Sequence, residues 1–343
     1  MNIRKLFMVF ITVCLIAGII AGCTVVDNTY VATVNGEKLT KAEFMLYYVR
    51  MQSNMLAEAG VEGEDIKTFW ETTEIEGKKA LDVAKDKALQ EAVEIMVVGQ
   101  KAKEKGITLG EEQLAEIESQ INAEISQYGS KADFDKELEY MNTTEEAFRN
   151  WTKSVYLANT VAGAMFEDES MAVTDEEAKE SIKQGYVKAK HILLMTVDEA
   201  TQQPLTGDKL TAVREQIADI QTRIKNGEDF DTLMNQYTQD PGIETNPDGY
   251  EFGKGEMVPE FETAAFALEV GEVSDIVTTD YGYHIIKREP LVLTDAKIEE
   301  LLPTEKNNLM INKIMAEIEK WVAESDVELE EKVIAKLEPS VVE

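Results

Sequence analysis

The feature that most constrains the fold of this chain is a change of texture near residue 186. Residues 30–185 and 291–343 contain long stretches rich in Ala, Glu, Lys and Leu, and their apolar residues recur at helical spacing. Residues 186–290 instead combine strand-like runs, helices and loops that contain Pro and Gly. The sequence therefore predicts an α+β protein in which a compact unit is inserted between two helical segments.

Capping and turn signals give the expected elements of the first segment. Asn35-Gly36 is a type I′ turn signal after the alternating run Tyr30–Val34, which predicts a short hairpin. The pattern of caps and breaks then predicts the helix starts and their ends. In chain order, these are a helix near Lys41–Glu58 after the box Thr40–Glu43, one near Lys78–Lys105 that stops at Gly106, one near Glu111–Gln127 capped by Thr108–Glu111, one started by the box Thr143–Glu146, and one from the box Thr174–Glu177 to Gly185.

After Pro290 the chain returns to helix, from Thr304 to about Ser325. An amphipathic helix of this kind needs an apolar partner. We expect this helix to pack on the N-terminal helices, so that one domain is built from both ends of the chain. Its candidate buried stripe is Leu309, Ile314, Ile318 and Trp321.

Residues 1–22 have the three parts of a secretory signal peptide. Two basic residues precede an apolar run from Leu6 to Ile20, which is followed by the small pair Ala21-Gly22 and by Cys23. The end of this segment resembles a bacterial lipobox, in which the Cys thiol is acylated, so we expect residues 23–29 to form a lipidated tether. The alternative is an uncleaved anchor helix, although the 17 residues between the basic pair and Cys23 are fewer than the roughly 20 that a spanning helix prefers.

Composition excludes several classes of function. The chain has 34 Lys and Arg against 66 Asp and Glu, a net charge of −32, which argues against nucleic acid as a partner. Two Cys and two His are too few for a zinc finger, a disulfide scaffold or an iron–sulfur protein. Nucleotide-binding glycine loops and a His-Glu-x-x-His pattern are absent from the sequence. We therefore expect neither a metal nor a cofactor.

The two histidines, His191 and His284, occur in matching contexts: Lys-His-Ile-Leu and Tyr-His-Ile-Ile. Each context is typical of a central strand. Two core histidines that satisfy each other by hydrogen bonding are one interpretation. A functional pair is the other, and it requires further polar and apolar residues around them.

The span from Lys188 to Arg288 supplies such residues, because it closely resembles the parvulin family of peptidyl-prolyl isomerases. The run KAKHILL matches the family's first strand with its His, and NGEDFDTLMNQYTQDPG matches the segment that ends at the family's Cys-or-Asp position. The run GKGEMVPEFETAAFALEVGEVSDIVTTDYGYHIIK matches the closing half. The resemblance implies an antiparallel sheet surrounded by helices, catalytic residues His191, Asp240, Thr279 and His284, and a proline pocket lined by Met257 and Phe261.

Two departures from the family pattern concern specificity. The usual Gly-Asp-Leu-Gly is replaced by Pro247–Tyr250, so Tyr250, together with Phe252, is the candidate for the third apolar wall of the pocket. The loop Val197–Ala200 is acidic, whereas parvulins that bind phosphorylated Ser/Thr-Pro carry basic residues there. We therefore do not expect a phosphate-directed enzyme.

A hypothesis for the chemistry follows from the residue types. The planar amide is more polar than the twisted state, so a dry apolar pocket favours the twisted state. Asp240 near the substrate carbonyl would further disfavour the planar form, while His191 and His284 hold each other and Thr279 in orientation. The plainer alternatives are a turn residue for Asp240 and an ordinary buried helix face for Phe261.

The whole chain resembles exported foldases of the SurA and PrsA kind, beginning with VATVNGEKLTKAEF at the start of their helical chaperone domain. This resemblance implies a helical chaperone domain from residues 30–185 and 291–343, an inserted isomerase domain at 186–290, and a lipid anchor on Cys23. The expected site of action is the outer face of the cell membrane, on unfolded or newly secreted polypeptides with X-Pro bonds. A homodimer is compatible with the sequence. The alternative is a tethered holdase whose parvulin domain is catalytically idle.

Overall fold

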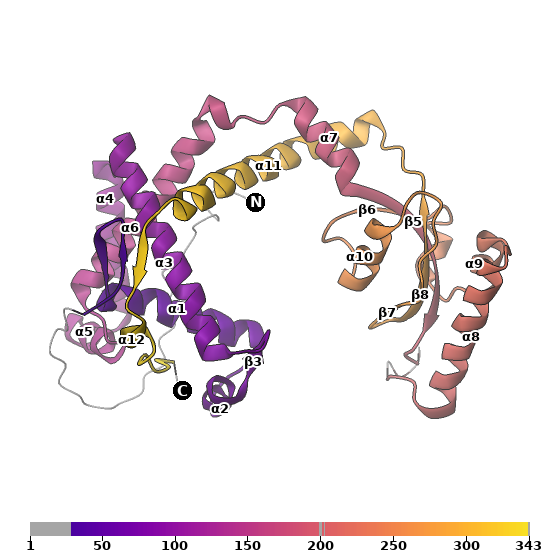
Figure 1. The fold of residues 1–343 in the computed structure, drawn as a ribbon, viewed down its shortest axis with the longest axis horizontal. Coiled ribbons are helices and arrows are strands. Elements are labelled where there is room, and N and C mark those ends of the chain that lie inside the picture. Colours follow the sequence, from indigo (N-terminus) through magenta and orange to yellow (C-terminus); the bar gives the residue numbers. More distant parts are fainter. Residues whose placement is uncertain (1–28, 199–200, 202, 342–343) are drawn as a thin grey trace. The chain divides into compact units, whose positions relative to one another are not determined.

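The computed structural model describes residues 29–198, 201 and 203–341, which form two compact units. The helical unit comprises the described residues up to Ala172 together with those from Asn307 onward, and the sheet unit is Val173–Lys306 (Figure 1). The α+β architecture with an inserted unit is thus confirmed. The domain limits at 186 and 290 stay a prediction. The sheet unit extends beyond both limits, because helix α7 (Asp175–Gly185) forms ion pairs with the first part of helix α11 (Asp295–Ala323).

The helical unit contains the expected hairpin, β1 (Tyr30–Val34) and β2 (Glu37–Thr40), around a left-handed Asn35-Gly36 turn. Strand β9 (Val327–Leu329) pairs with the other side of β1, so the sheet order is β2-β1-β9. The helices expected from the sequence are α1 (Lys41–Ala59), α3 (Ala80–Lys105), α4 (Glu111–Gln127) and α6 (Glu145–Glu167). The elements not predicted are α2 (Asp65–Thr72), β3 (Glu74–Ile75), β4 (Lys78–Lys79), α5 (Lys131–Tyr140), η2 (Glu169–Met171) and α12 (Glu331–Ile334).

The helix caps explain most of these boundaries. Thr40 and Glu43 form the predicted capping box, and Gly106 ends α3 in the left-handed conformation with φ 70°. The predicted box at Thr143 is wrong by one residue: Thr144 caps α6, whereas the Thr143 hydroxyl donates to the carbonyl of Ala42. The start of α4 is correct, but its cap is Gly110 and not Thr108.

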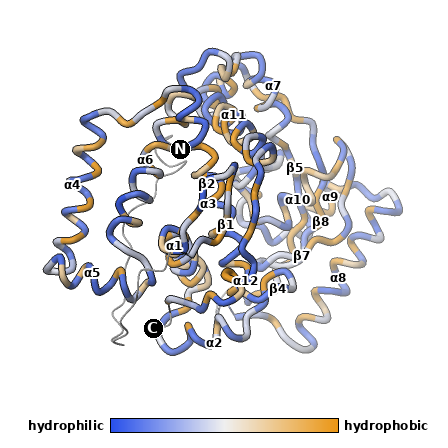
Figure 2. The backbone as a smooth tube through the Cα atoms, turned by 60° about the vertical axis from the view of Figure 1, so that its left-hand side comes forward, coloured by the Kyte–Doolittle hydropathy of each residue, from blue (hydrophilic) through white to orange (hydrophobic). Residues whose placement is uncertain are grey.

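Helix α11 joins the core of the helical unit as expected. Ile314 and Ile318 are fully buried and Trp321 is nearly so, in one apolar cluster with residues of β1, α1, α3 and α6. Leu309 is only half-buried. Figure 2 shows hydrophilic and hydrophobic residues interspersed along the helices, as amphipathic packing requires.

The predicted start of α11 at Thr304 is wrong. The helix begins nine residues earlier, at Asp295, and continues through Pro303. Thr294 caps it, because the Thr294 hydroxyl accepts from the amide of Lys297. A proline inside a helix is disfavoured, which is why the sequence pattern placed the start after Pro303.

The sheet unit is built on four antiparallel strands: β5 (Tyr186–Met195), β6 (Tyr250–Gly253), β7 (Val277–Thr279) and β8 (Gly282–Glu289), in the order β6-β5-β8-β7. Helices α8 (Gly207–Lys225) and α9 (Phe230–Tyr237) pack on one face, and α10 (Pro259–Ala267) packs on the other (Figure 1). Helices α8 and α9 are separated at Asn226-Gly227, where Gly227 has φ 92°.

The burial of α11 generates a prediction about the stability of the helical unit. Ile318→Ala is expected to lower its free energy of unfolding by about 2–5 kcal/mol, because the substitution leaves a cavity in the core. Urea unfolding followed by Trp fluorescence measures this unit alone, since all three Trp residues, Trp70, Trp151 and Trp321, belong to it.

The matched control for Ile318→Ala is Asn312→Ala on the exposed side of α11, which should change the free energy by less than about 0.5 kcal/mol. Equal effects of the two substitutions would contradict the packing of α11 on this core.

Candidate active site

A row of four side chains crosses one face of the sheet, one from each strand: Tyr250 on β6, His191 on β5, His284 on β8 and Thr279 on β7. The register explains why they share a face. His191 is opposite Ile286 and Leu193 is opposite His284, so the two histidines are diagonal neighbours on the same side of the sheet. Their ring centroids lie 5.3 Å apart.

Hydrogen bonds fix both ends of this row. The Thr279 hydroxyl lies 2.9 Å from Nε2 of His284, and it accepts from the amide of Tyr281 at 3.2 Å. At the other end, the Tyr250 hydroxyl donates to Oδ2 of Asp240 at 2.6 Å. The same carboxylate oxygen lies 3.5 Å from Nε2 of His191. The polar chain therefore runs from Asp240 to Thr279 across the whole sheet.

Asp240 reaches the row because the loop after α9 continues the edge of β5 beyond the end of β6. The amide of Gln239 donates to the carbonyl of Leu193 at 2.8 Å, and the amide of Leu193 donates to the Thr238 hydroxyl at 3.1 Å. Asp240 itself caps the short helix η3 (Pro241–Glu244) by accepting from the amide of Gly242. Asp240 is thus a turn residue that caps η3 and also a member of the polar row.

Tyr250 has a contact that the sequence reasoning missed. The sequence predicts Tyr250 only as an apolar wall, but its hydroxyl donates to Asp240 while its ring centroid lies 5.7 Å from that of His191. The tyrosine hydroxyl lies close over Gly242, where a Cβ would overlap it. Burial, and then the bond to Asp240 with its charge, hold the pKa of Tyr250 above its usual range, so the phenol keeps its proton and stays a donor.

Aromatic side chains cover the two histidines. Phe261 on α10 meets both imidazoles edge-on, at centroid distances of 5.1 and 5.5 Å, and only 4% of it is exposed. Phe252 is buried behind Phe261, with ring centroids 5.8 Å apart. Met257 is half-buried in the same apolar cluster. All eight predicted residues of the sheet unit are therefore brought together, while their individual roles stay a prediction.

Both imidazoles are neutral at neutral pH. Burial lowers the pKa of His191 below its usual value of 6.5, although the charge of Asp240 opposes this shift. Burial, with a contribution from His191, lowers the pKa of His284 to about 4. Among the described residues, neither Nδ1 atom has a hydrogen-bond partner. The site therefore holds two desolvated, uncharged rings. No hydrogen bond joins these rings, so the interpretation that the two histidines satisfy each other by hydrogen bonding is wrong: Nε2 of His284 bonds to Thr279, and Nε2 of His191 lies beside Asp240.

These shifts predict a titration that NMR can follow cleanly, because His191 and His284 are the only histidines of the chain. The His284 ring should take up its proton near pH 4, and the His191 ring below pH 6.5. Since the unfolded chain binds this proton at about 6.5, the contribution of His284 to stability is complete above pH 6.5. It is lost as the pH falls toward about 4, by on the order of 3 kcal/mol. An imidazole that titrates at or above 6.5 would contradict the desolvated site.

The predicted signal peptide and Cys23 lie outside the described residues. Within the part of the chain that the structure describes, none of the helices combines the length and the apolar character needed to cross a membrane.

Comparisons with known proteins agree with both units. Residues 191–290 match the family model of the PPIC-type PPIase domain, and residues 2–162 match that of the SurA-like N-terminal domain. The foldase protein PrsA of Caldanaerobacter subterraneus subsp. tengcongensis is 33% identical over 301 residues, which cover 86% of each chain. The foldase protein PrsA of Geobacillus sp. (strain WCH70) is 35% identical over 226 residues, which cover 63% of this chain and 72% of that relative.

The crystal structure of peptidylprolyl isomerase (PrsA) from Bacillus anthracis is 25% identical and covers 68% of this chain and 94% of that chain, with a TM-score of 0.31. The extent and identity of the sequence matches establish the family. The protein belongs to the PrsA foldases and carries a parvulin-type peptidyl-prolyl isomerase domain.

Proposed function

We propose that this protein is a foldase on the outer face of the cell membrane, held there by a lipid on Cys23. It isomerises X-Pro bonds in newly secreted polypeptides and shields those polypeptides while they fold. The observation that carries the isomerase part is the row Tyr250–His191–His284–Thr279 under the cover of Phe261. Support for the anchor comes from the lipobox-like end of the apolar run before Cys23.

The proposed chemistry requires no bond to be made or broken. Rotation about an amide must cross a barrier of roughly 18–20 kcal/mol, because it destroys the resonance that separates charge between N and O. The twisted amide is less polar than the planar one, so an apolar, water-poor surface stabilises it relative to the ground state. Met257 and Phe261 are suited to surround the proline ring in this way.

The polar row has a positioning role in this mechanism. A neutral imidazole held by Thr279 and a second one beside Asp240 present fixed dipoles without the desolvation penalty of a buried charge. The carboxylate of Asp240 is oriented by Gly242 and Tyr250. Its negative charge near the substrate carbonyl disfavours the charge-separated planar amide, which is the form that the enzyme must leave.

A tethered holdase with an idle parvulin domain is the second candidate. The observation that favours it is the bond from Tyr250, a residue that departs from the family pattern, to Oδ2 of Asp240, because this bond occupies one oxygen of the proposed catalytic carboxylate. The two candidates predict opposite effects of Tyr250→Phe on the isomerase activity.

The proposal predicts that the chain accelerates cis–trans exchange in an Ala-Pro or Glu-Pro peptide, measured by exchange NMR. Met257→Ala should lower kcat/KM by about tenfold or more, because the pocket loses an apolar wall worth roughly 2 kcal/mol of transition-state stabilisation. The matched control is Glu260→Ala on the exposed side of α10, which should retain the activity. Absence of acceleration by the folded wild-type chain would overturn the isomerase part and leave the holdase.

Tyr250→Phe removes one hydroxyl and separates the two candidates. If Tyr250 positions Asp240 for catalysis, kcat/KM should fall by about tenfold, the cost of losing a hydrogen bond to a charged group. If that bond instead keeps the domain idle, the same substitution should raise the activity. In a chain that already carries Asp240→Ala, Tyr250→Phe should have no further effect, since the hydroxyl then has no carboxylate to hold.

A further inference from the structure

A second apolar site lies in the helical unit, far in sequence from the isomerase residues. A groove of about 220 Å³ is lined by residues of β2, α1, α3 and α6. Its apolar lining includes Leu39, Tyr47, Met96, Trp151 and Leu157. Small-molecule sites are usually larger, roughly 300–1,000 Å³, so the size suits one or two protein side chains better than a metabolite.

Strand β2 supplies an open sheet edge along this groove. Within the described residues, β2 pairs only with β1, so its other side is unpaired. The two-residue turn makes Val34 and Glu37 a hydrogen-bonded pair, and the antiparallel alternation then directs the N–H and C=O of Lys38 away from β1. Lys38 also lines the groove. A free backbone donor and acceptor therefore border a cavity whose lining is partly apolar.

One residue that lines the groove carries a further unsatisfied group. Only 2% of Trp151 is exposed, its ring meets Tyr47 edge-on, and its Nε1–H has no hydrogen-bond partner among the described residues. Buried indole N–H groups normally have a partner. The carbonyl of a bound peptide is a suitable acceptor for this indole N–H, once binding shifts the side chains around Trp151.

The charged side chains that line the groove have partners within the chain, and the ammonium of Lys38 lies over the ring of Tyr30. Glu37 is paired with Lys103 at 2.8 Å, and Glu43 is used in the capping box with Thr40. Short charged edge strands often serve to prevent pairing with other chains. What distinguishes β2 is the apolar groove along it, kept open in part by Gly99, around whose missing Cβ no atom lies within 4 Å.

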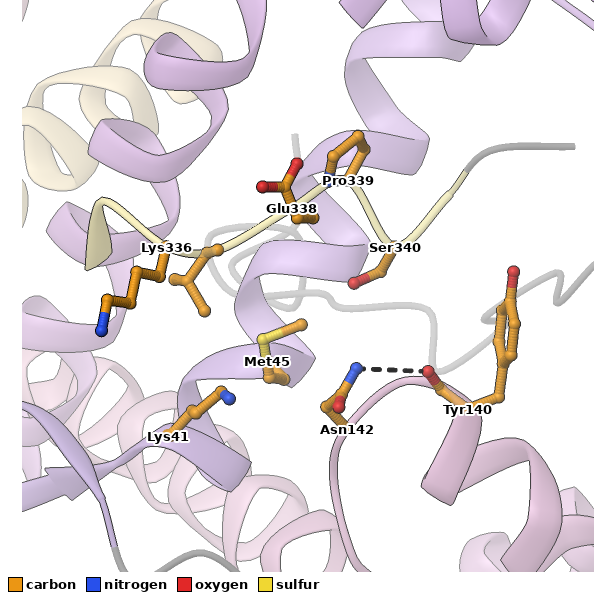
Figure 3. Close-up of a pocket in the computed structure, with 9 residues that line it drawn as sticks. Lys41, Met45, Tyr140, Asn142, Lys336, Glu338, Pro339 and Ser340 are labelled. Carbon is orange, nitrogen blue, oxygen red and sulfur yellow. Dashed lines mark hydrogen bonds between the residues drawn. The ribbon is translucent and has the colours of Figure 1, made fainter. Parts of the chain in front are cut away.

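The same unit already shows how it holds an extended segment. A larger cavity, about 310 Å³, is bordered by α1 and by the C-terminal residues Lys336–Ser340 (Figure 3). The side chain of Gln52 accepts from the amides of Ser340 and Val341, and the indole of Trp70 donates to the carbonyl of Val341. The chain's own C-terminal segment thus borders that cavity, whereas the groove beside β2 is bordered by no such segment among the described residues.

We propose that the groove beside β2 binds an extended apolar stretch of an unfolded polypeptide. The backbone of the stretch pairs with Lys38 and adds a strand to the sheet β2-β1-β9, while a large apolar side chain enters between Tyr47, Met96 and Leu157. The proposal rests on the shielding part of the proposed function and gives it a location. It is independent of the isomerase residues.

The test uses the full chain and a fluorescent, proline-free peptide of roughly six to eight residues that alternates Phe and Thr between terminal lysines. Absence of proline keeps the isomerase pocket out of the measurement. Gly99→Leu fills the groove from a helical position that has room for a side chain. Leu also has a higher helix propensity than Gly, so the substitution does not weaken α3. The matched control is Gly163→Leu in α6, which is also helical and open but does not line the groove.

The expected result in fluorescence anisotropy is a peptide affinity about tenfold lower for Gly99→Leu and within roughly twofold of wild type for Gly163→Leu. Leu157→Gln, at a half-buried position of the groove, is the second variant if Gly99→Leu does not fold. Isomerisation of a short X-Pro peptide should be unchanged in Gly99→Leu, so loss of this site and loss of the isomerase are distinguishable.

A second pair of variants tests the backbone contact. Lys38→Pro removes the outward N–H without removing a bond to β1. Lys38→Thr keeps this N–H and removes the charge together with its contact to the Tyr30 ring. We expect an affinity about tenfold lower for Lys38→Pro and little change for Lys38→Thr. Three results would each overturn the proposal. The first is wild-type peptide affinity in Gly99→Leu, and the second is a wild-type chain that is active as an isomerase but binds no peptide. The third is a dimer that Gly99→Leu dissociates without a change in peptide affinity.

Discussion

The site depends on the register between β5 and β8. These strands pair from Lys188–Glu289 to Met195–Gly282, and this pairing alone brings two histidines that are 93 positions apart in the sequence (284 minus 191) to one face. A slip of one residue would turn one strand's histidine to the opposite face, beside Ile192 or Ile285 in the core under α8 and α9. Gly282 helps to fix the register, because a Cβ there would overlap the carbonyl of Leu194.

The two faces of the sheet explain why the histidines are neutral. Ile192, Leu194 and Ile285 fill one face with aliphatic side chains, and the other face is closed by Phe252 and Phe261. An imidazole placed between such layers loses its hydration in the charged form, so its pKa falls. The same water-poor surface is what a twisted amide prefers. Burial therefore accounts both for the electrostatics of the residues and for the proposed catalysis.

Local signals predicted the parts of the fold that are decided locally. Thr40, Glu43 and Gly106 mark helix ends through contacts within a few residues, and the contexts of His191 and His284 predicted that each lies in a strand. The structure differs from the sequence predictions where a contact between residues distant in the sequence determines the position of a side chain. Thr143 bonds to Ala42 instead of capping α6, and Tyr250 bonds to Asp240 across a loop. The groove beside β2 was not predictable from any single motif, because four separate elements contribute to it.

We propose that the site isomerises an amide with two neutral imidazoles and transfers no proton. The most direct test compares kcat/KM for an X-Pro peptide in H₂O and in D₂O at matched pH and pD, by exchange NMR. If no proton moves in the rate-limiting step, the two rates should be equal within error. A markedly slower reaction in D₂O, lost on His284→Gln, would contradict the account and make the histidines acid–base catalysts.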